Sequence, residues 1–439
     1  MNDRKTWLDR ALSIVTEVRS GEGVGALILA VNIFSVLTFY SVLKVIRDQL
    51  ILTEGGAEVK SYSAAGQALL ALAFVPAYAF VAARVNRMRL ITVVTVFFAL
   101  NLVAFALLGL ANVQIAVVFF IWTGLFSLVM VAQFWAFAND LYSPERGKRL
   151  FPLVGVGQSL GGVAGASVGV IFAGVNPYLL MLPAAIGLLL PLGLTFLANR
   201  RERAAGHDAA AAAADAPIGR RNGFRLVFSD RYLFLIAMLF VVLNLVNTLG
   251  GFLLDRLIVE ESLRQVAAGI SADQREVVAR LSGGVQLSVN VLGFLLQTFA
   301  VSRIFNLVGV RGALFILPIL ALGSYAMIAA IPIFAVVRVA KIVENSTDYS
   351  IQQTTRHALF LPTSREAKYN AKQAIESFFW RAGDLLQAVV VFVGATLAFT
   401  VSHFAAVNVV LVLIWLGIVV AIVREHRKLM PVESQEKAA

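Results

Sequence analysis

The chain has 439 residues, of which 59% are hydrophobic and only 14% are charged. Soluble domains carry roughly 25% charged residues, so this chain has too few to cover a water-facing surface. The net charge of +11 could suggest nucleic acid, but the basic residues lie between apolar runs and lack interleaved aromatics. The absence of cysteine excludes disulfides, thiolate metal sites and cysteine nucleophiles. The composition predicts a protein of the lipid bilayer with no nucleic-acid partner.

Residues 1–22 are predicted to form an N-terminal segment outside the membrane. The segment lacks the short apolar core and small-residue cleavage site of a signal peptide. Its apolar residues recur at helical spacing, which is typical of an amphipathic helix lying on a membrane surface. These residues are Trp7, Leu8, Ala11, Leu12 and Val15.

Twelve long apolar runs follow, and a membrane-spanning helix needs about 20 apolar residues. The first six are predicted at 24–52, 62–85, 89–110, 113–139, 152–174 and 177–197. The second six are predicted at 232–258, 281–305, 311–330, 332–352, 371–400 and 405–423. The sequence therefore predicts an all-α, multi-pass membrane protein.

Basic residues gather in every second loop, whereas the connections at 110–113, 174–177 and 330–332 carry no charge. The basic loops lie within 84–89, 146–149, 200–225, 303–311, 356–368 and 424–428. By the positive-inside rule these loops face the cytoplasm, so both termini are predicted to be cytoplasmic and the protein to lie in the inner membrane. An even number of spans agrees with that orientation.

The two sets of six spans resemble each other at equivalent positions. Asp48-Gln49-Leu50-Ile51 in the first span matches Asp255-Arg256-Leu257-Ile258 in the seventh. Two parallel six-helix repeats are typical of major-facilitator-like carriers, in which two bundles rock around a central site. The predicted division is an N-terminal segment 1–22, bundles at 23–198 and 232–424, a cytoplasmic linker at 199–231 with an alanine run, and a tail at 425–439. We expect a monomer.

Ionisable residues inside the predicted spans are functional candidates, because burying charge in a membrane is costly. The span at 332–352 carries Arg338, Lys341, Glu344 and Asn345, and Lys341 can pair with Glu344 at i,i+3. The alternative is that such pairs only neutralise each other at a helix interface.

Two other spans carry charge as well. The span at 371–400 has Arg381 within reach of Asp384. The first span carries Lys44, Arg47 and Asp48 toward its outer end, where the alternative is that they extend to the membrane interface.

The candidates carry an excess of positive charge, which favours an anionic substrate held by charge-assisted hydrogen bonds. The predicted substrate-binding residues are Lys44, Arg47, Arg338, Lys341 and Arg381. The predicted coupling or gating residues are Asp48, Glu344, Asn345 and Asp384. A proton-coupled carrier with Glu344 or Asp384 as the proton site remains an alternative, and so does a membrane scaffold or lipid-interacting protein that transports nothing.

A glycine recurs every fourth residue in the fifth span, at Gly157, Gly161, Gly165 and Gly169. This pattern predicts close helix packing rather than a phosphate loop, since no Lys-Ser or Lys-Thr pair follows. The histidines fall in loops or at span ends without ligand spacing, and no hydrolase motif is present. The sequence therefore predicts no enzyme, no catalytic residue, no cofactor and no metal site.

Three charged segments resemble the ATP:ADP antiporter family, distant relatives of the major facilitator superfamily that include exchangers of ATP for ADP and phosphate. They are "FYSVLKVIRDQLILTEGGAE" (39–58), "FWAFANDLYSPERGKRLFPLVGVGQSLGGVAG" (134–165) and "RHALFLPTSREAKYNAKQAIESFFWRAGDLLQ" (356–387). The resemblance covers both halves and is most specific at 356–387. It implies twelve spans and transport of nucleotides or related anions.

Position by position, the resemblance is incomplete. The family's basic-acidic pair at the end of the first span matches Arg47 and Asp48. The nucleotide exchangers have an acidic residue where this chain has Thr123, and a lysine where it has Asp384. The chain is therefore similar to a wider, free-living bacterial branch whose substrates need not be ATP and ADP.

Overall fold

The computed structural model describes residues 6–13, 16–82, 84–142, 144–204, 223–364 and 367–429, and within these ranges every regular element is a helix. Ten helical stretches are long and apolar enough to cross a membrane. One of them, Gln274–Ala330, contains two spans because Gly309 interrupts the helix with a φ of 64°. The helical pieces from Phe334 to Ala358 cover the predicted span at 332–352, which is not among these ten. The described helices are thus consistent with the twelve spans that the sequence predicts.

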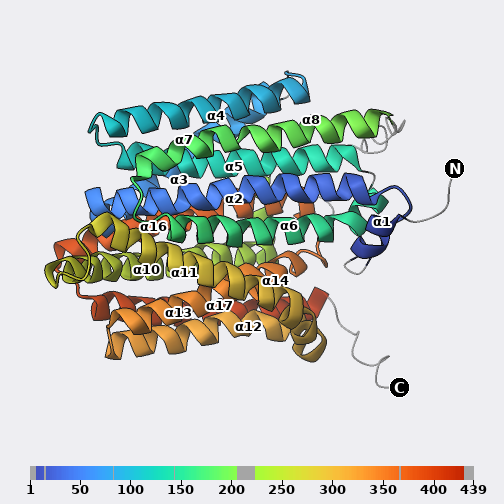
Figure 1. The fold of residues 1–439 in the computed structure, drawn as a ribbon. Coiled ribbons are helices and arrows are strands. Elements are labelled where there is room, and N and C mark those ends of the chain that lie inside the picture. Colours follow the sequence, from blue (N-terminus) through green and yellow to red (C-terminus); the bar gives the residue numbers. More distant parts are fainter. Residues whose placement is uncertain are drawn as a thin grey trace. The chain divides into compact units, whose positions relative to one another are not determined.

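The first half contains seven helices after the N-terminal helix α1 (Trp7–Leu12) (Figure 1). They are α2 (Gly23–Glu54), α3 (Gly56–Ala82), α4 (Arg87–Leu110), α5 (Ala116–Leu141), α6 (Pro144–Ile171), α7 (Pro177–Gly187) and α8 (Leu189–Ala204). Helices α7 and α8 together form the sixth span. The predicted linker with its alanine run lies largely outside the described residues, which resume at Gly223.

The second half alternates α-helices with π-helical turns. Its elements are α9 (Gly223–Ser229), α10 (Arg231–Ala267), α11 (Gln274–Leu295), η2 (Leu296–Ala300), α12 (Val301–Ala330), α13 (Phe334–Thr347), η3 (Asp348–Gln352), α14 (Gln353–Ala358), η4 (Ala367–Ala371), α15 (Lys372–Ala374), η5 (Ile375–Phe379), α16 (Trp380–Thr396) and α17 (Val401–Leu429). Helix α10 continues past its predicted end at 258, because backbone hydrogen bonding persists after the apolar run stops.

The chain forms two compact units. Each unit contains most of one half of the sequence together with a short segment of the other half. Unit 1 comprises residues 1–55, 73–216 and 265–287, and unit 2 comprises 56–72, 217–264 and 288–439. The first part of α11 thus packs in unit 1, and the first part of α3 packs in unit 2. The division into bundles at 23–198 and 232–424 stays a prediction.

Unit 1 is built around the contact between α2 and α6, which lie side by side (Figure 1). The four glycines of α6 face α2, and an added Cβ at the first three would run into backbone carbonyls of that helix. Gly157 faces Ala30, Gly161 faces Phe34 and Gly165 faces Thr38, while a Cβ on Gly169 would lie 2.8 Å from Val45 Cγ2. The predicted close packing of this glycine stripe is confirmed.

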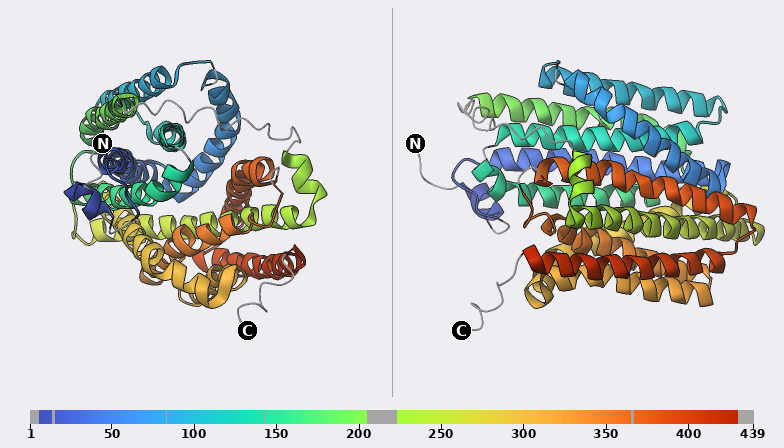
Figure 2. Two further views of the ribbon diagram at one scale, coloured as in Figure 1. Left: turned by 90° about the vertical axis from the view of Figure 1, so that its right-hand side faces the viewer. Right: turned by 180° about the vertical axis from the view of Figure 1, so that it is seen from behind.

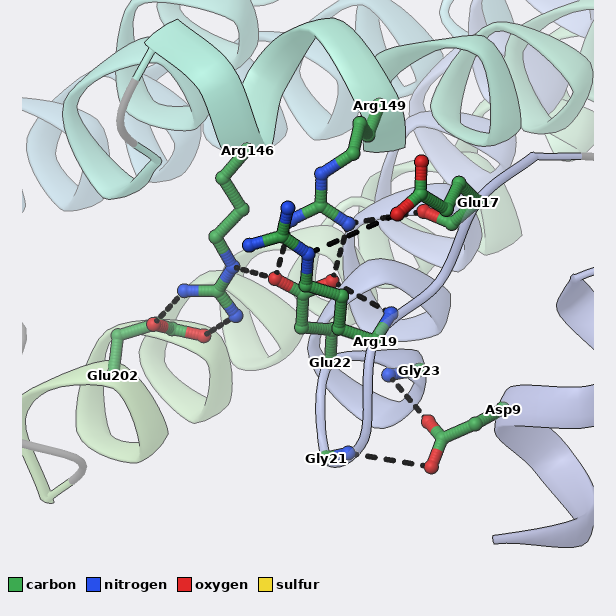
Figure 3. A network of polar contacts seen from close by, with 9 residues as sticks. All are labelled: Asp9, Glu17, Arg19, Gly21, Glu22, Gly23, Arg146, Arg149 and Glu202. Carbon is green, nitrogen blue, oxygen red and sulfur yellow. Dashed lines mark hydrogen bonds and ion pairs between the residues drawn. The ribbon is translucent and has the colours of Figure 1, made fainter. Parts of the chain in front are cut away.

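The N-terminal helix α1 contains Trp7, Leu8, Ala11 and Leu12 of the predicted apolar set, whereas Val15 lies outside the described residues. The helix is held in place by a carboxylate. Asp9 is only 1% exposed, and its carboxylate accepts hydrogen bonds from the amides of Gly21 (3.2 Å) and Gly23 (2.9 Å) (Figure 3). Burial acts to raise the pKa of Asp9, but hydrogen bonds from Thr6, Gly21 and Gly23 outweigh it and lower the pKa to about 2. Trp7 is 79% exposed, and its placement on a membrane surface stays a prediction.

A network of ion pairs joins the ends of α2, α6 and α8 in unit 1 (Figure 3). Arg149 holds both carboxylate oxygens of Glu22 at 2.9 Å. Arg146 holds Glu202 at 2.7 and 3.1 Å and approaches Glu22 at 3.5 Å. Burial acts to raise the pKa of Glu22, but its hydrogen bond from Arg149 and the nearby positive charges lower it overall.

In unit 2, α12 and α17 lie side by side along their lengths (Figure 2). Helix α10 lies deep within this unit, because most of its span is buried. Polar side chains from α12, α13, η3, α14 and α16 converge on α10, and they form the candidate site.

Candidate functional site

Two asparagines on α10 organise the polar interior of unit 2. Asn244 and Asn247 lie three residues apart and therefore face the same side of the helix. Each of them contacts an ion pair that the sequence predicts. Neither asparagine was identified from the sequence, although two amide side chains within an apolar run were a signal that could have found them.

The first ion pair joins Lys341 and Glu344 of α13 at 3.1 Å, and the two side chains are 1% and 3% exposed. The Lys341 ammonium also donates to the backbone oxygen of Asn247 (3.1 Å) and to its Oδ1 (2.9 Å). Glu344 accepts a further hydrogen bond of 2.7 Å from the hydroxyl of Tyr325 on α12. The predicted pair is confirmed, and all three donors of the ammonium have acceptors in this conformation.

Gly250 of α10 makes room for this pair. An added Cβ there would run into the hydroxyl of Tyr325 and would lie 3.0 Å from Lys341 Nζ. The Tyr325 hydroxyl oxygen also lies 3.3 Å from the backbone oxygen of Val246, one turn earlier on α10. Tyr325 was also missed from the sequence, because nothing in the apolar ninth span indicates where its hydroxyl points.

The second ion pair joins Asp348 of η3 and Arg356 of α14 at 3.4 Å. Asp348 Oδ2 accepts a hydrogen bond of 3.3 Å from the Asn247 amide. The Arg356 guanidinium lies 4.9 Å from the ring centroid of Trp380 and 5.5 Å from that of Phe240, so cation–π contacts also hold it. Arg356 is predicted to lie in a basic loop, whereas it lies on α14 within unit 2 and is 9% exposed.

The third ion pair joins Arg381 and Asp384 of α16 at 3.3 Å and confirms the predicted contact. Asn244 donates to Asp384 Oδ1 at 2.7 Å and to the backbone oxygen of Trp380 at 2.8 Å. Gly383 permits this approach, since a Cβ there would lie 2.8 Å from Asn244 Cβ. The Arg381 side chain is 23% exposed and is therefore more accessible than Lys341.

Two other predicted residues of unit 2 have polar groups without a partner among the described residues. Arg338 of α13 is half-buried and makes no hydrogen bond or ion pair with any other described residue. Asn345 has a buried Oδ1 without a hydrogen-bond partner among the described residues.

The remaining predicted residues lie on α2 in unit 1. Arg47 donates to Asp48 at 3.0 and 2.8 Å, and its guanidinium lies 4.5 Å from the ring centroid of Phe120. Lys44 is half-buried one turn earlier on the same helix. With Arg356 and Asp348 added, the candidates of unit 2 are four cations and three carboxylates, and those of unit 1 are two cations and one carboxylate, so each unit keeps a positive excess among its candidates.

Comparisons with known proteins identify the fold. No family model and no curated protein matches the sequence. A solved POT family transporter in complex with a thioalcohol-conjugated peptide aligns with a TM-score of 0.63 at 14% identity, over 94% of this chain and 97% of its own.

Two further solved structures agree with it. The nucleoside transporter NupG aligns with a TM-score of 0.62 at 10% identity, over 91% of this chain and 98% of its own. A bacterial homolog of the human lysosomal transporter Spinster, inward-facing and unoccupied, aligns with a TM-score of 0.59 at 14% identity, over 92% and 98%. The chain is thus an all-α membrane protein with the major-facilitator-like fold of these transporters.

Proposed function

We propose that the chain is a secondary transporter that carries an anionic solute across the cell membrane by alternating access. The observation that carries this proposal is the positive excess on membrane-spanning helices of a fold shared with solved transporters. Arg338 supplies a cation with no partner among the described residues, and Arg381 supplies one that is partly exposed. A charge inside a membrane is retained where it has a function, and an anionic ligand would supply the missing counter-charge.

The substrate class that fits best is a nucleotide or another phosphorylated metabolite, carried by exchange. Guanidinium groups hold phosphate oxygens through paired hydrogen bonds, which favours this class over a neutral solute. The resemblance of three segments to ATP:ADP antiporters supports the same class. The departures argue for a substrate other than ATP and ADP, since Thr123 is fully buried and bonded to the Phe119 carbonyl, and Asp384 adds a carboxylate.

Different roles follow for the cations. Arg338 and Arg381 of unit 2 would contact the substrate's anionic groups, and Lys44 and Arg47 on α2 of unit 1 are proposed as further substrate-binding residues. Lys341 could do so only after its contact with Glu344 opens, because its donors are all occupied. Glu344, Asp384 and Asp48 would hold their cations while no substrate is bound, and Asn345 would offer its unpaired oxygen.

The proposal includes a location and an orientation. The positive loops predict that both termini face the cytoplasm and that the protein lies in the inner membrane as a monomer. Labelling of single cysteines introduced at exposed loop positions, in a chain that otherwise has none, would report this topology.

Counterflow into liposomes tests the function. Purified protein is reconstituted into liposomes preloaded with one phosphorylated compound, and uptake of the same labelled compound is measured across nucleotides, sugar phosphates and inorganic phosphate. We expect counterflow with at least one of them, and a loss of tenfold or more in Arg381→Ala.

Arg264→Ala is the matched control, because that side chain is 75% exposed and pairs only on the surface, with Glu261. Its counterflow should equal that of the wild type. Absence of counterflow with every anion, together with absence of uptake under a pH gradient, would overturn the proposal in favour of a non-transporting membrane scaffold.

A further inference from the structure

A cluster of unpaired polar atoms occupies one face of the tenth span in unit 2. Roughly 90% or more of buried polar groups in proteins have a hydrogen-bond partner. Here five buried atoms have none among the described residues: Asn345 Oδ1, Asp348 Oδ1, Gln352 Oε1, Gln352 Nε2 and Arg356 Nη1. Spacings of three and four residues put all four side chains on the same side of the helical stretch. Asp348 is 1% and Gln352 0% exposed.

The three buried carboxylates of unit 2 differ in how fully they are bonded. Both oxygens of Asp384 accept hydrogen bonds, from Asn244 and Arg381. Glu344 Oε2 accepts from the Tyr325 hydroxyl at 2.7 Å and contacts the Lys341 ammonium at 3.1 Å. Asp348 Oδ2 accepts one hydrogen bond of 3.3 Å from Asn247, and Oδ1, which has no hydrogen bond among the described residues, lies 3.4 Å from the Arg356 guanidinium. Asp348 is therefore the carboxylate with the longest contacts of the three.

We propose that Asp348 is a proton-binding site. A protonated carboxyl is a hydrogen-bond donor, and two unpaired acceptors lie one turn to either side, Asn345 Oδ1 and Gln352 Oε1. In the binding step, hydronium transfers a proton to Asp348 Oδ1, an O–H bond forms and a water molecule is left. The new hydroxyl donates to one of the two amide oxygens, and release is the reverse.

The charged groups around Asp348 have no net charge before a proton binds. Lys341 and Glu344 lie on the same span, Arg356 follows on α14, and Tyr325 reaches Glu344 from α12. Helix α10 contributes only the neutral Asn247, while the Arg381–Asp384 pair of α16 is joined to Asn244. Lys341 and Arg356 balance Glu344 and Asp348, so one proton changes the group from neutral to one net positive charge.

The backbone at this point forms one of the four π-helical turns described in the second half. Asp348 begins the π-helical turn η3, which ends at Gln352. Single π-helical turns inside α-helices are rare and often lie at functional sites. The turn places the proposed donor and one of its acceptors on the same widened segment, where small backbone changes would move them relative to each other.

Proton binding itself is independent of the solute, whereas a role in coupling rests on the proposed transport function. In an exchanger of anions of unequal charge, one proton per cycle would offset one unit of charge. Breaking the Asp348–Arg356 pair would also release Arg356 from its carboxylate, which gives protonation a route to a change of conformation.

Infrared difference spectroscopy of the purified protein tests the proposal without any solute. A drop from about pH 8 to about pH 5 should produce the carbonyl band of a protonated carboxyl group in the wild type. Asp348→Asn should remove this band. Asp140→Asn is the matched control, because the Asp140 side chain is 58% exposed and pairs with Arg87 in unit 1, and it should leave the band intact.

A second variant keeps the test decisive if Asp348→Asn does not fold. The double variant Asn345→Leu/Gln352→Leu removes both acceptors for the protonated form, so the band should appear only at a proton concentration roughly tenfold higher, the effect of losing one hydrogen bond. The proposal is overturned if the band persists in Asp348→Asn, if it disappears in Glu344→Gln or Asp384→Asn instead, or if the double variant leaves its pH dependence unchanged. None of these outcomes alters the counterflow result.

Discussion

Helices associate differently in the two units, by backbone contact between α2 and α6 in unit 1 and by polar contacts among α10, α13 and α16 in unit 2. Helices in a membrane gain little from burying apolar surface against one another, so they associate through close packing or polar contacts. Unit 1 uses glycines that bring one backbone against another. Unit 2 uses Gly250 and Gly383 to admit the polar side chains of Lys341, Tyr325 and Asn244.

The difference determines what each region can do. A contact between glycines and backbone depends on shape alone and has no group that can change partners. A contact made of ion pairs and amides is directional, and its members can exchange partners when a charged ligand or a proton arrives. The chemistry proposed for this chain therefore belongs mainly to unit 2.

The largest effect should come from leaving a charge unpaired in the polar contact. Glu344→Ala keeps the Lys341 ammonium buried without its carboxylate, and such a change costs about 3–5 kcal/mol of stability. Thermal unfolding in detergent should show a large fall, whereas Glu145→Ala at an exposed position should change little. The double variant Lys341→Met/Glu344→Leu should recover most of the stability while lacking transport. A small loss in Glu344→Ala would contradict the assignment of a buried, paired charge.

A smaller effect is expected at the glycine contact. Gly161→Ala pushes a methyl group toward the Phe34 carbonyl and forces α6 away from α2, an overpacking cost of about 1–3 kcal/mol. Gly155→Ala is the matched control, since an added Cβ there meets no atom within 4 Å, and it should be neutral or stabilising. Equal effects of the two substitutions on unfolding would show that the glycines do not set the helix distance.

The ion pairs at the end of unit 1 should matter less again. Arg149→Ala removes a paired contact with Glu22, and partly exposed pairs of good geometry contribute about 1 kcal/mol. Raised salt should reduce the difference between variant and wild type, because it screens the pair. Unfolding curves at two salt concentrations measure this, and a difference that does not respond to salt would argue for a packing effect instead.

The most local effect concerns the docking of α1. The pKa of Asp9 in the folded chain, about 2, lies below the ordinary value of about 3.9. Its contribution is therefore fully present above about pH 4 and is lost as the pH falls through about 2. Hydrogen exchange of residues 7–12 should be slow at neutral pH and faster in Asp9→Asn. An unchanged exchange rate in that variant would mean that the carboxylate does not hold α1.

The sequence predicts contacts within one helix better than contacts between helices. The Lys341–Glu344 and Arg381–Asp384 pairs follow from i,i+3 spacing, and the glycine stripe follows from its period of four. Asn244 and Asn247 could not be assigned, because their partners come from helices 140 and 94 residues away in sequence. The helix ends also differ, since helical hydrogen bonding continues beyond the apolar run in α10.

The most direct test of the account is a thermal-shift measurement on purified wild-type protein and Arg381→Ala with a panel of phosphorylated anions. A ligand present at 100 times its dissociation constant stabilises the folded state by about 2.7 kcal/mol. We predict that at least one anion raises the unfolding temperature of the wild type and has little effect on Arg381→Ala. If no anion shifts the wild type, or if the variant responds equally, unit 2 does not bind an anion as proposed.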